Sequence, residues 1–209
     1  MKKKIIITGG LGYIGTELCK LYSGVSWHHQ IIVIDNRFIS ERVNQIRNWN
    51  MDFIQGDILD KELIKRYCSD ADVIHHLAGV TNVPRTKSEV SAGQDDKIKE
   101  VGEKGTQNIL NVISNKCKII FPSTHVVYEG IDKVKTNIME SEEIKPVLSY
   151  SSSKAINEDQ LKKSGKNYVI LRLGSVYGYS TDSMRIDIMP NLFSKISSQN
   201  GTLKLFAGG

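Results

Sequence analysis

Tyr150 and Lys154 are the two side chains whose types and spacing most clearly permit chemistry. A separation of four residues places both on one face of a helix, one turn apart. A phenol has a pKa of about 10 and is a poor base at neutral pH, but a nearby ammonium group stabilises the phenolate and lowers that pKa. The pair can therefore remove a proton from a substrate hydroxyl. Ser149 and Ser151 are candidate caps for the start of this helix.

The same spacing occurs a second time, at Tyr168 and Arg172, and a count of tyrosines and basic residues leads us to expect about one such pair by chance. Tyr168 lies in a predicted strand, so the context favours Tyr150 as the reactive residue. The alternative for Tyr150 and Lys154 is an ordinary surface helix.

A glycine-rich turn near the N-terminus places Gly9, Gly12 and Gly15 three residues apart, between a β-branched run and an amphipathic segment. Glycine adopts the φ values of such a turn, and the next helix offers free N–H groups to a pyrophosphate. Asp35 ends the following apolar run, where a carboxylate can accept hydrogen bonds from an adenosine ribose. This pattern predicts NAD binding in preference to NADP, although Arg37 lies nearby. The alternative is a tight turn with an unrelated Asp35.

Short apolar runs alternate with longer amphipathic segments along the chain. The runs are continuous, which is typical of strands buried on both faces of a parallel sheet. The predicted strands are Lys4–Ile7, Ile31–Ile34, Met51–Ile54, Val73–Leu77, Cys117–Phe121, Tyr168–Leu171 and Leu203–Phe206. The predicted helices are Tyr13–Tyr22, Lys61–Tyr67, Lys97–Ile113, Ser151–Lys163 and 187–198. The expected fold class is α/β, a doubly wound parallel sheet with helices on both faces.

The composition is that of a globular protein. Apolar residues make up 40% and charged residues 24% of the 209 residues, and 28 basic against 23 acidic side chains give a net charge of +5. A soluble cytoplasmic chain is expected, because the sequence has neither an apolar stretch of membrane-spanning length nor a signal peptide. The basic residues are mixed with acidic ones, so no nucleic-acid surface is expected. The cysteines and the pairs His28-His29 and His75-His76 lack metal-ligand spacing, so no metal site is expected.

Four segments together resemble one known family: 8–15 (TGGLGYIG), Gly56-Asp57-Ile58, His76-Leu77-Ala78-Gly79 and Gly105-Thr106-Gln107-Asn108. They are similar to motifs of the extended short-chain dehydrogenase/reductases, the NAD-dependent nucleotide-sugar epimerases and dehydratases that include UDP-glucose 4-epimerase. The resemblance implies a Rossmann fold with NAD as the cofactor. It implies NAD contacts from Gly9, Gly12, Tyr13, Ile14, Gly15, Asp35, Asn36, Asp57, Ile58, Leu77, Ala78, Gly79 and Lys154.

The resemblance also implies a catalytic threonine. Segment 120–128 is similar to the family's strand that carries the catalytic hydroxyl, and Thr124 takes that place beside Tyr150 and Lys154. The alternative for Thr124 is a threonine that caps a turn at the strand end. His125-Val126 stand where the 4,6-dehydratases have an Asp-Glu pair, so water elimination is not expected. Segment 123–130 also resembles that of 4-keto-sugar reductases.

Substrate contacts are implied less directly. Segment 171–179 is similar to a family segment that contains an Asn, which helps to place the sugar nucleotide. In this sequence Ser175 stands at the position of that Asn. Elsewhere in the chain, Gly102 stands at the position of a second family Asn. The resemblance to 4-keto-sugar reductases extends to Thr81-Asn82-Val83 and to Glu89. Thr81, His125 and Ser175 are the candidate substrate contacts.

Residues 1–173 are expected to form the NAD-binding Rossmann domain, and 174–209 only the start of a small C-terminal substrate domain, because the end of the chain resembles a segment before the family's substrate region. Charged segment 129–146 is expected to be a surface excursion. The leading prediction is an NAD-dependent nucleotide-sugar epimerase that acts through a transient 4-keto sugar. The alternatives are a 4-keto-sugar reductase or dehydrogenase of the same family, or a non-catalytic NAD-binding module. A homodimer is expected through helices that carry Ile109, Ile113 and Leu161, although these side chains could instead pack on the sheet.

Overall fold

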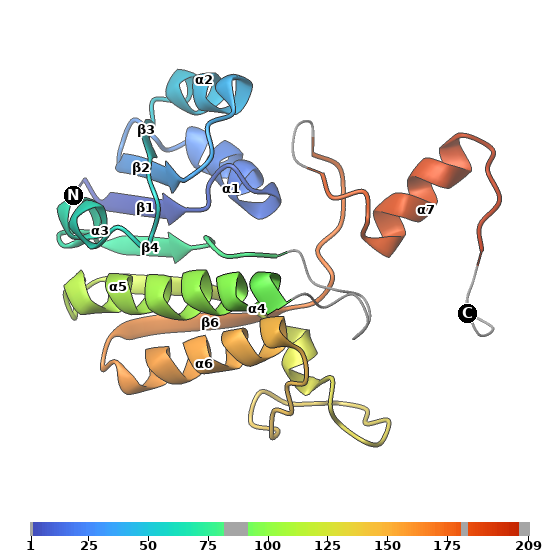
Figure 1. Cartoon of the computed structure of the whole chain (residues 1–209). Helices are drawn as coiled ribbons and strands as arrows, with labels where there is room; N and C mark the ends of the chain where they lie inside the picture. The colour runs from blue at the N-terminus through green and yellow to red at the C-terminus, as the bar shows by residue number, and fades with distance from the viewer. Residues whose placement is uncertain (1, 82–91, 181–183, 205–209) are drawn as a thin grey trace.

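A six-stranded parallel sheet in the order β3-β2-β1-β4-β5-β6 organises the chain (Figure 1). The structure, a computed structural model, describes residues 2–81, 92–180 and 184–204. The strands are β1 (Lys4–Thr8), β2 (Gln30–Asp35), β3 (Asp52–Gln55), β4 (Val73–His76), β5 (Lys118–Thr124) and β6 (Asn167–Leu173). The order reverses between β1 and β4, as in a doubly wound Rossmann sheet, so the predicted fold class is confirmed.

Helices cover both faces of the sheet. They are α1 (Tyr13–Ser23), α2 (Ser40–Asn48), α3 (Lys61–Cys68), α4 (Ala92–Lys99), the π-helix η2 (Glu100–Lys104), α5 (Gly105–Val112), the 3-10 helix η3 (His125–Tyr128), α6 (Ser149–Lys163) and α7 (Met189–Ser198). α1 and α2 contribute buried side chains to the core on one face, and α3, α5 and α6 to the core on the other. α7 lies away from the sheet in Figure 1.

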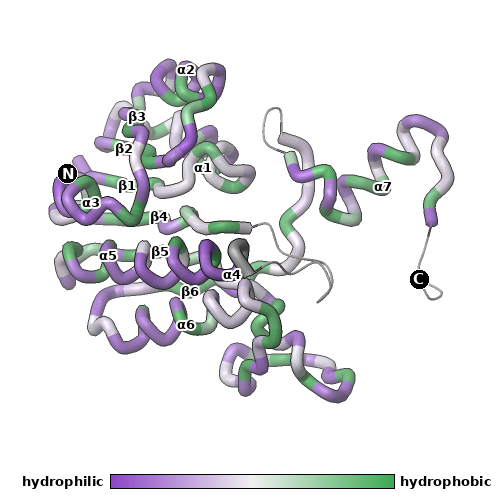
Figure 2. The backbone as a smooth tube through the Cα atoms, viewed as in Figure 1, coloured by the Kyte–Doolittle hydropathy of each residue, from purple (hydrophilic) through white to green (hydrophobic). Residues whose placement is uncertain are grey.

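The continuous apolar strands supply both cores because successive side chains point to opposite faces. Ile5 and Ile7 belong to the core beneath α1 and α2, whereas Ile6 between them belongs to the core beneath α3, α5 and α6. Figure 2 shows hydrophobic and hydrophilic residues interleaved along α5, as expected for a helix with one buried side. Ile109, Ile113 and Leu161 are buried in the second core, so these three side chains pack on the sheet and do not form an exposed dimer surface.

The six main strands and most helices lie where the sequence predicts them, with three differences. α2 was not predicted. The single helix expected over 97–113 is interrupted by the π-helical turn η2. At the predicted strand Leu203–Phe206, residues 203–204 are not in a strand and the other two lie outside the described residues.

Segment 129–146 leaves the sheet as an exposed excursion, as predicted, and returns to it through paired backbone hydrogen bonds. Gly130 N donates to Lys145 O at 2.8 Å, and Lys145 N donates to Val127 O at 2.8 Å. The excursion also fixes the chain that enters α6, because the Glu129 carboxylate accepts from the backbone N–H groups of Val147 and Leu148, each at 2.7 Å. The N-cap is Leu148, so neither Ser149 nor Ser151 takes that position; Ser151 instead accepts a 3.2 Å hydrogen bond from Leu148 N.

Candidate active site at the carboxyl edge of the sheet

The glycine turn is shaped by its contacts with the neighbouring strand end. Gly9 has φ +71°, and a Cβ on it would lie 2.7 Å from the backbone N of Ala78, just after β4. A Cβ on Gly15 would lie 2.6 Å from Gly10 Cα, so α1 can pack on the turn only with a glycine there. Gly9 and Gly15 are therefore required by the fold itself.

Gly12 has a different reason to be glycine. Its φ of −77° and ψ of 175° are open to any residue. A Cβ on Gly12 would meet the Gly9 carbonyl oxygen at 3.2 Å, which calls for only a small adjustment. Gly12 is the N-cap of α1, and the first turn of that helix carries no acidic side chain. The missing side chain leaves the helix N-terminus open to an anionic group.

Asp35 ends β2 and is buried beside this turn. Its carboxylate accepts from Leu11 N at 3.0 Å and from Arg37 N and Nε at 3.1 Å each. Asp35 therefore holds the backbone of the glycine turn, at Leu11, against the end of β2. The side chain of Asp35 is 4% exposed and that of Arg37 is 53% exposed, so the guanidinium lies on the solvent side of the carboxylate. Any further hydrogen-bond donor to this carboxylate must share it with Arg37.

The loop after β3 is held by the helix motif Gly105-Thr106-Gln107-Asn108. Asn108 Nδ2 donates to the carbonyl oxygens of Ile58 at 3.1 Å and Leu59 at 3.3 Å. Asp57 accepts from Asn36 Nδ2 at 3.0 Å, so the loops after β2 and β3 are joined at the same edge. Gly105 lies against Ile58, whose Cγ1 would be 2.7 Å from an added Cβ. The structure thus brings Asn36, Asp57 and Ile58 to the edge that carries the glycine turn.

The buried His76 ring, at the end of β4, lies between the hydroxyl groups of two threonines. Its Nδ1 lies 2.9 Å from Thr8 Oγ1 and its Nε2 lies 3.0 Å from Thr106 Oγ1. Thr8 Oγ1 also accepts from Ala78 N at 3.2 Å. Burial, aided by the nearby Lys154 charge, lowers the pKa of His76 to about 3, so the ring is neutral. His76 therefore acts as a neutral link that positions Leu77-Ala78-Gly79.

Thr124, Tyr150 and Lys154 come from β5 and α6 at the same edge. Lys154 Nζ donates to Pro122 O at 2.8 Å and lies 4.3 Å from the centre of the Phe121 ring and 6.0 Å from that of Tyr150. Thr124 Oγ1 accepts from Val126 N at 3.3 Å and caps η3, which is the alternative role considered for it. The Thr124 hydroxyl can still donate a hydrogen bond to a ligand while it accepts from Val126 N.

Burial dominates the electrostatics of the pair. It lowers the pKa of Lys154 to about 8, against the opposing effect of Glu158. It raises the pKa of Tyr150 above its ordinary value, although the Arg185 guanidinium acts in the opposite direction. The expected lowering of the Tyr150 pKa is thus wrong for the chain alone, because desolvation of the phenolate outweighs the nearby positive charge.

A small cavity of about 20 Å³ lies where the segment after β4 meets β5 and α6. It is lined by Ala78, Gly79 and Val80 after β4, Phe121 of β5, Ile98 of α4, Gly102 of η2, and Tyr150, Ser153, Lys154 and Asn157 of α6. Neither Thr124 nor a residue of the glycine turn lines it. Five lining residues are not among those predicted from the sequence: Val80, Ile98, Phe121, Ser153 and Asn157. Ser153 and Asn157 share a spacing of four residues on the helix that carries Tyr150, which is the signal that could have found them.

The candidate substrate residues are spread over the surface of this edge. His125 is exposed, and its Nδ1 lies 3.1 Å from Leu173 O at the end of β6. Thr81 and Ser175 are also exposed, as is Ile14 among the candidate cofactor residues. Tyr13 reaches the same region, because its hydroxyl donates to Gly178 O at 2.5 Å. Asn82, Val83 and Glu89 lie outside the described residues.

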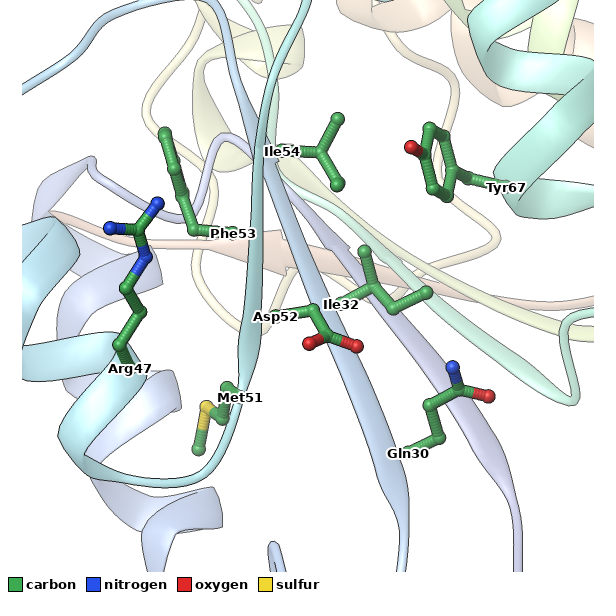
Figure 3. Close-up of a pocket in the computed structure, with 8 residues that line it drawn as sticks. All are labelled: Gln30, Ile32, Arg47, Met51, Asp52, Phe53, Ile54 and Tyr67. Carbon is green, nitrogen blue, oxygen red and sulfur yellow. The ribbon is translucent and has the colours of Figure 1, made fainter.

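A larger pocket of about 330 Å³ lies elsewhere, around the edge strand β3 (Figure 3). Arg47, Met51 and Phe53 lie on one side of β3, and Ile54 and Tyr67 on the other. The pocket contains none of the predicted cofactor, catalytic or substrate residues. Size alone therefore does not identify the candidate active site in this molecule.

The sequence as a whole matches a known family. Residues 5–209 match the NAD dependent epimerase/dehydratase family. The chain belongs to this family. A dTDP-D-glucose 4,6-dehydratase of Dictyostelium discoideum is 30% identical over 197 residues, which are 84% of this chain and 44% of that protein. A putative UDP-glucose 4-epimerase of Methanocaldococcus jannaschii is 30% identical over 186 residues, which are 85% of this chain and 57% of that one.

The family fold is also seen in a solved structure. UDP-glucuronic acid 4-epimerase from Bacillus cereus, in complex with UDP-glucuronic acid and NAD, has a TM-score of 0.77 at 24% identity. The match covers 99% of this chain and 66% of that one. The epimerase/dehydratase domain described here spans about half the length of the curated relatives named above.

The described part of the chain shows neither a membrane-spanning helix nor a metal-binding cluster. None of its helices is long and apolar enough to cross a membrane. Within residues 2–81, 92–180 and 184–204, no cluster of three or more His, Cys, Asp or Glu side chains could hold a metal ion.

Proposed function

We propose that this chain binds NAD along the carboxyl edge of its sheet and epimerises a nucleotide sugar through a transient 4-keto sugar. The observation that carries the proposal is that Tyr150 and Lys154 line the same cavity as Ala78 and Gly79. These two residues follow β4, and Ala78 packs against Gly9 of the glycine turn. The family match supports NAD as the cofactor. The named relatives that act on UDP-glucose or UDP-glucuronic acid support a nucleotide sugar as the substrate.

The residues present fit a dinucleotide. The open N-terminus of α1 at Gly12 suits the pyrophosphate, with Tyr13, Ile14 and Gly15 continuing the first turn. Asp35 and Asn36 would hold the adenosine ribose, and Asp57 and Ile58 the adenine. Leu77, Ala78, Gly79 and Lys154 would line the nicotinamide end. When bound, NAD supplies a two-electron acceptor for a hydride from the sugar.

Tyr150 performs the proton transfers in this proposal. Its phenolate oxygen takes the proton of the sugar 4-hydroxyl while C4 loses a hydride, which leaves a 4-keto sugar. It returns that proton when a hydride adds to the other face of C4, so the net reaction inverts C4 and consumes no oxidant. Lys154 stabilises the phenolate, and Thr124 donates its hydroxyl proton to the reacting sugar oxygen. Thr81, His125 and Ser175 would contact the sugar nucleotide.

Isotope transfer tests this function. UDP-glucose and UDP-glucuronic acid, each deuterated at C4, are incubated with the chain and NAD, and the products are analysed by mass spectrometry and NMR. We expect the C4 epimer with the deuterium retained and no net change in NADH absorbance. Net oxidation or reduction of the cofactor would instead support the reductase or dehydrogenase alternative. Binding of NAD without any product would support the non-catalytic module.

Gly12→Ala provides a direct test of the proposed cofactor site. The added methyl group fits the backbone conformation but occupies the space above the helix N-terminus. We expect NAD affinity to fall by about tenfold or more, equivalent to about 1.4 kcal/mol, with little change in the free energy of unfolding. The measurement is calorimetric titration with NAD.

Gly24→Ala is the matched control, because Gly24 follows the other end of α1 and an added Cβ meets no atom closer than 4.0 Å. We expect its NAD affinity to equal that of the wild type. Equal affinities of Gly12→Ala and wild type would contradict the proposed position of the pyrophosphate.

We infer three further properties from the family resemblance. Residues 1–173 form the NAD-binding domain and 174–209 the start of the substrate-binding region. The protein forms a homodimer through surfaces that do not include Ile109, Ile113 or Leu161, which are buried in the core. It acts in the cytoplasm, where nucleotide sugars and NAD would be its small-molecule partners.

A further inference from the structure

Glu158 has a buried carboxylate that contacts β5 and β6 beside the candidate active site. It lies on α6 one turn after Lys154 and is 0% exposed. Its Oε1 accepts from Ser123 Oγ at 2.6 Å and from Arg172 Nε at 2.9 Å. Its Oε2 accepts from Arg172 Nη2 at 2.7 Å, and Lys162 Nζ lies 3.4 Å from the same oxygen. A charge this deeply buried is costly to the fold unless it is paired and hydrogen-bonded.

The Ser123 contact connects Glu158 to the reactive end of β5. Ser123 precedes Thr124, and it follows Pro122, whose carbonyl oxygen accepts from Lys154 Nζ at 2.8 Å. Both residues that flank Ser123 thus belong to the proposed catalytic arrangement. Because the Ser123 hydroxyl is tied to α6, the strand end and the helix that bears Tyr150 are held together at this point.

Arg172 extends the same network to β6 and to the excursion. Its Nη1 donates to Glu140 O at 3.0 Å and to the Tyr128 hydroxyl. Its guanidinium carbon lies 5.1 Å from the centre of the Tyr128 ring. The Glu158–Arg172 ion pair therefore connects α6 to β5 through Ser123, and to β6 and the excursion through Arg172.

Charge provides a second connection, to Lys154. The ionisable groups that act on or near Lys154 are Glu158 and Tyr150 on α6 and His76 on β4, which is neutral. Burial destabilises the protonated form of Lys154, and the Glu158 carboxylate opposes that effect. Glu158 thus supplies the negative charge that favours an ammonium group at Lys154.

We propose that Glu158 is the positioning residue of the site: its carboxylate ties the Ser123–Thr124 strand end to α6 and places a negative charge one helical turn from Lys154. This role rests on the proposed function, in which Lys154 must be charged to stabilise the Tyr150 phenolate. Glu158 itself would touch neither NAD nor the sugar.

The protonation of Lys154 can be measured directly. The chain is labelled with 13C at the lysine ε carbons and titrated by NMR, and the Lys154 signal is identified by its loss in Lys154→Met. We expect Glu158→Gln to lower the titration midpoint of Lys154 by about one pH unit or more, because a neighbouring opposite charge has been removed. Glu158→Asp keeps the charge, and we expect it to restore most of the midpoint.

Asp159→Asn is the matched control, since it removes a carboxylate from the next position on α6. Asp159 is exposed and is paired with Lys163 at 2.7 Å. We expect the Lys154 midpoint in this variant to equal that of the wild type.

The double variant Glu158→Gln/Arg172→Met covers the case in which Glu158→Gln does not fold. It removes both charges of the buried pair, so no unpaired charge remains. We expect the Lys154 midpoint to fall here too, but by less than in Glu158→Gln, because loss of the Arg172 positive charge opposes loss of the carboxylate. An unchanged midpoint in the folded single or double variant would overturn the role of Glu158. The titration uses neither NAD nor a sugar nucleotide, so that result would leave the proposed function standing, whereas failed NAD binding would remove it independently.

Discussion

Tyr150→Phe is expected to lower the turnover number for C4 epimerisation by at least about a hundredfold, the range typical of a lost general acid–base group. The substitution removes the phenolic oxygen that exchanges a proton with the sugar hydroxyl and leaves the ring that lines the cavity. NAD affinity should stay within about twofold of wild type, or about 0.4 kcal/mol, because the proposed pyrophosphate and ribose contacts lie on other elements. The measurements are turnover of UDP-glucose or UDP-glucuronic acid and calorimetric titration with NAD.

Tyr168→Phe is the control for this substitution. Tyr168 has the same four-residue spacing to a basic residue, but it lies in β6 and is 37% exposed. We expect unchanged turnover in this variant. Turnover in Tyr150→Phe equal to that of wild type would refute the assignment of Tyr150 as the proton-transfer group.

Arg172→Met should destabilise the fold strongly. Glu158 would lose its paired guanidinium, with the Nε and Nη2 contacts at 2.9 and 2.7 Å, and its carboxylate would stay buried. Removing one partner of a buried ion pair typically costs about 3–5 kcal/mol. We expect a loss of that size in the free energy of unfolding, measured by urea titration at neutral pH.

The double variant Glu158→Gln/Arg172→Met should regain most of that loss, since replacing both partners leaves no unpaired charge. Asp159→Asn, which removes an exposed carboxylate from the same helix, should change the free energy of unfolding by less than about 0.5 kcal/mol. A loss below about 1 kcal/mol in Arg172→Met would show that the pair is solvated and does not hold the strand ends together.

The strands and the glycine turn could be predicted from the sequence because their signals are local. Five continuous apolar runs mark β1, β2, β4, β5 and β6, and Gly9 and Gly15 have contacts that only glycine allows. The helix α2 gave no comparable signal, since only Val43 and Ile46 of its nine residues are buried and apolar.

Other features depend on contacts between distant segments. The π-helical turn packs Gly102 against α6. A Cβ added to Gly102 would lie 2.5 Å from Ser153 Oγ, and the Gly102 carbonyl oxygen accepts from Asn157 Nδ2 at 3.1 Å. The chain that leads into α6 is held by Glu129, at the start of the excursion. Spacing along the chain carries no information about such partners.

For a related reason, nothing in the sequence indicated that burial raises the pKa of Tyr150 in the chain without NAD. Residue spacing placed a positive charge near the phenol but could not report how far the phenol is buried. Glu158 and Arg172 were likewise overlooked as a pair, because their significance lies in the burial of the carboxylate between β5 and β6.

The central claim is that the carboxyl edge of this sheet is an NAD site, and parallel calorimetric titration of the chain with NAD and NADP tests it most directly. We expect NAD to bind with a Kd in the micromolar range and NADP to bind about tenfold or more weakly, since the Asp35 carboxylate disfavours an additional phosphate. Failure of a demonstrably folded chain to bind either dinucleotide would contradict the claim.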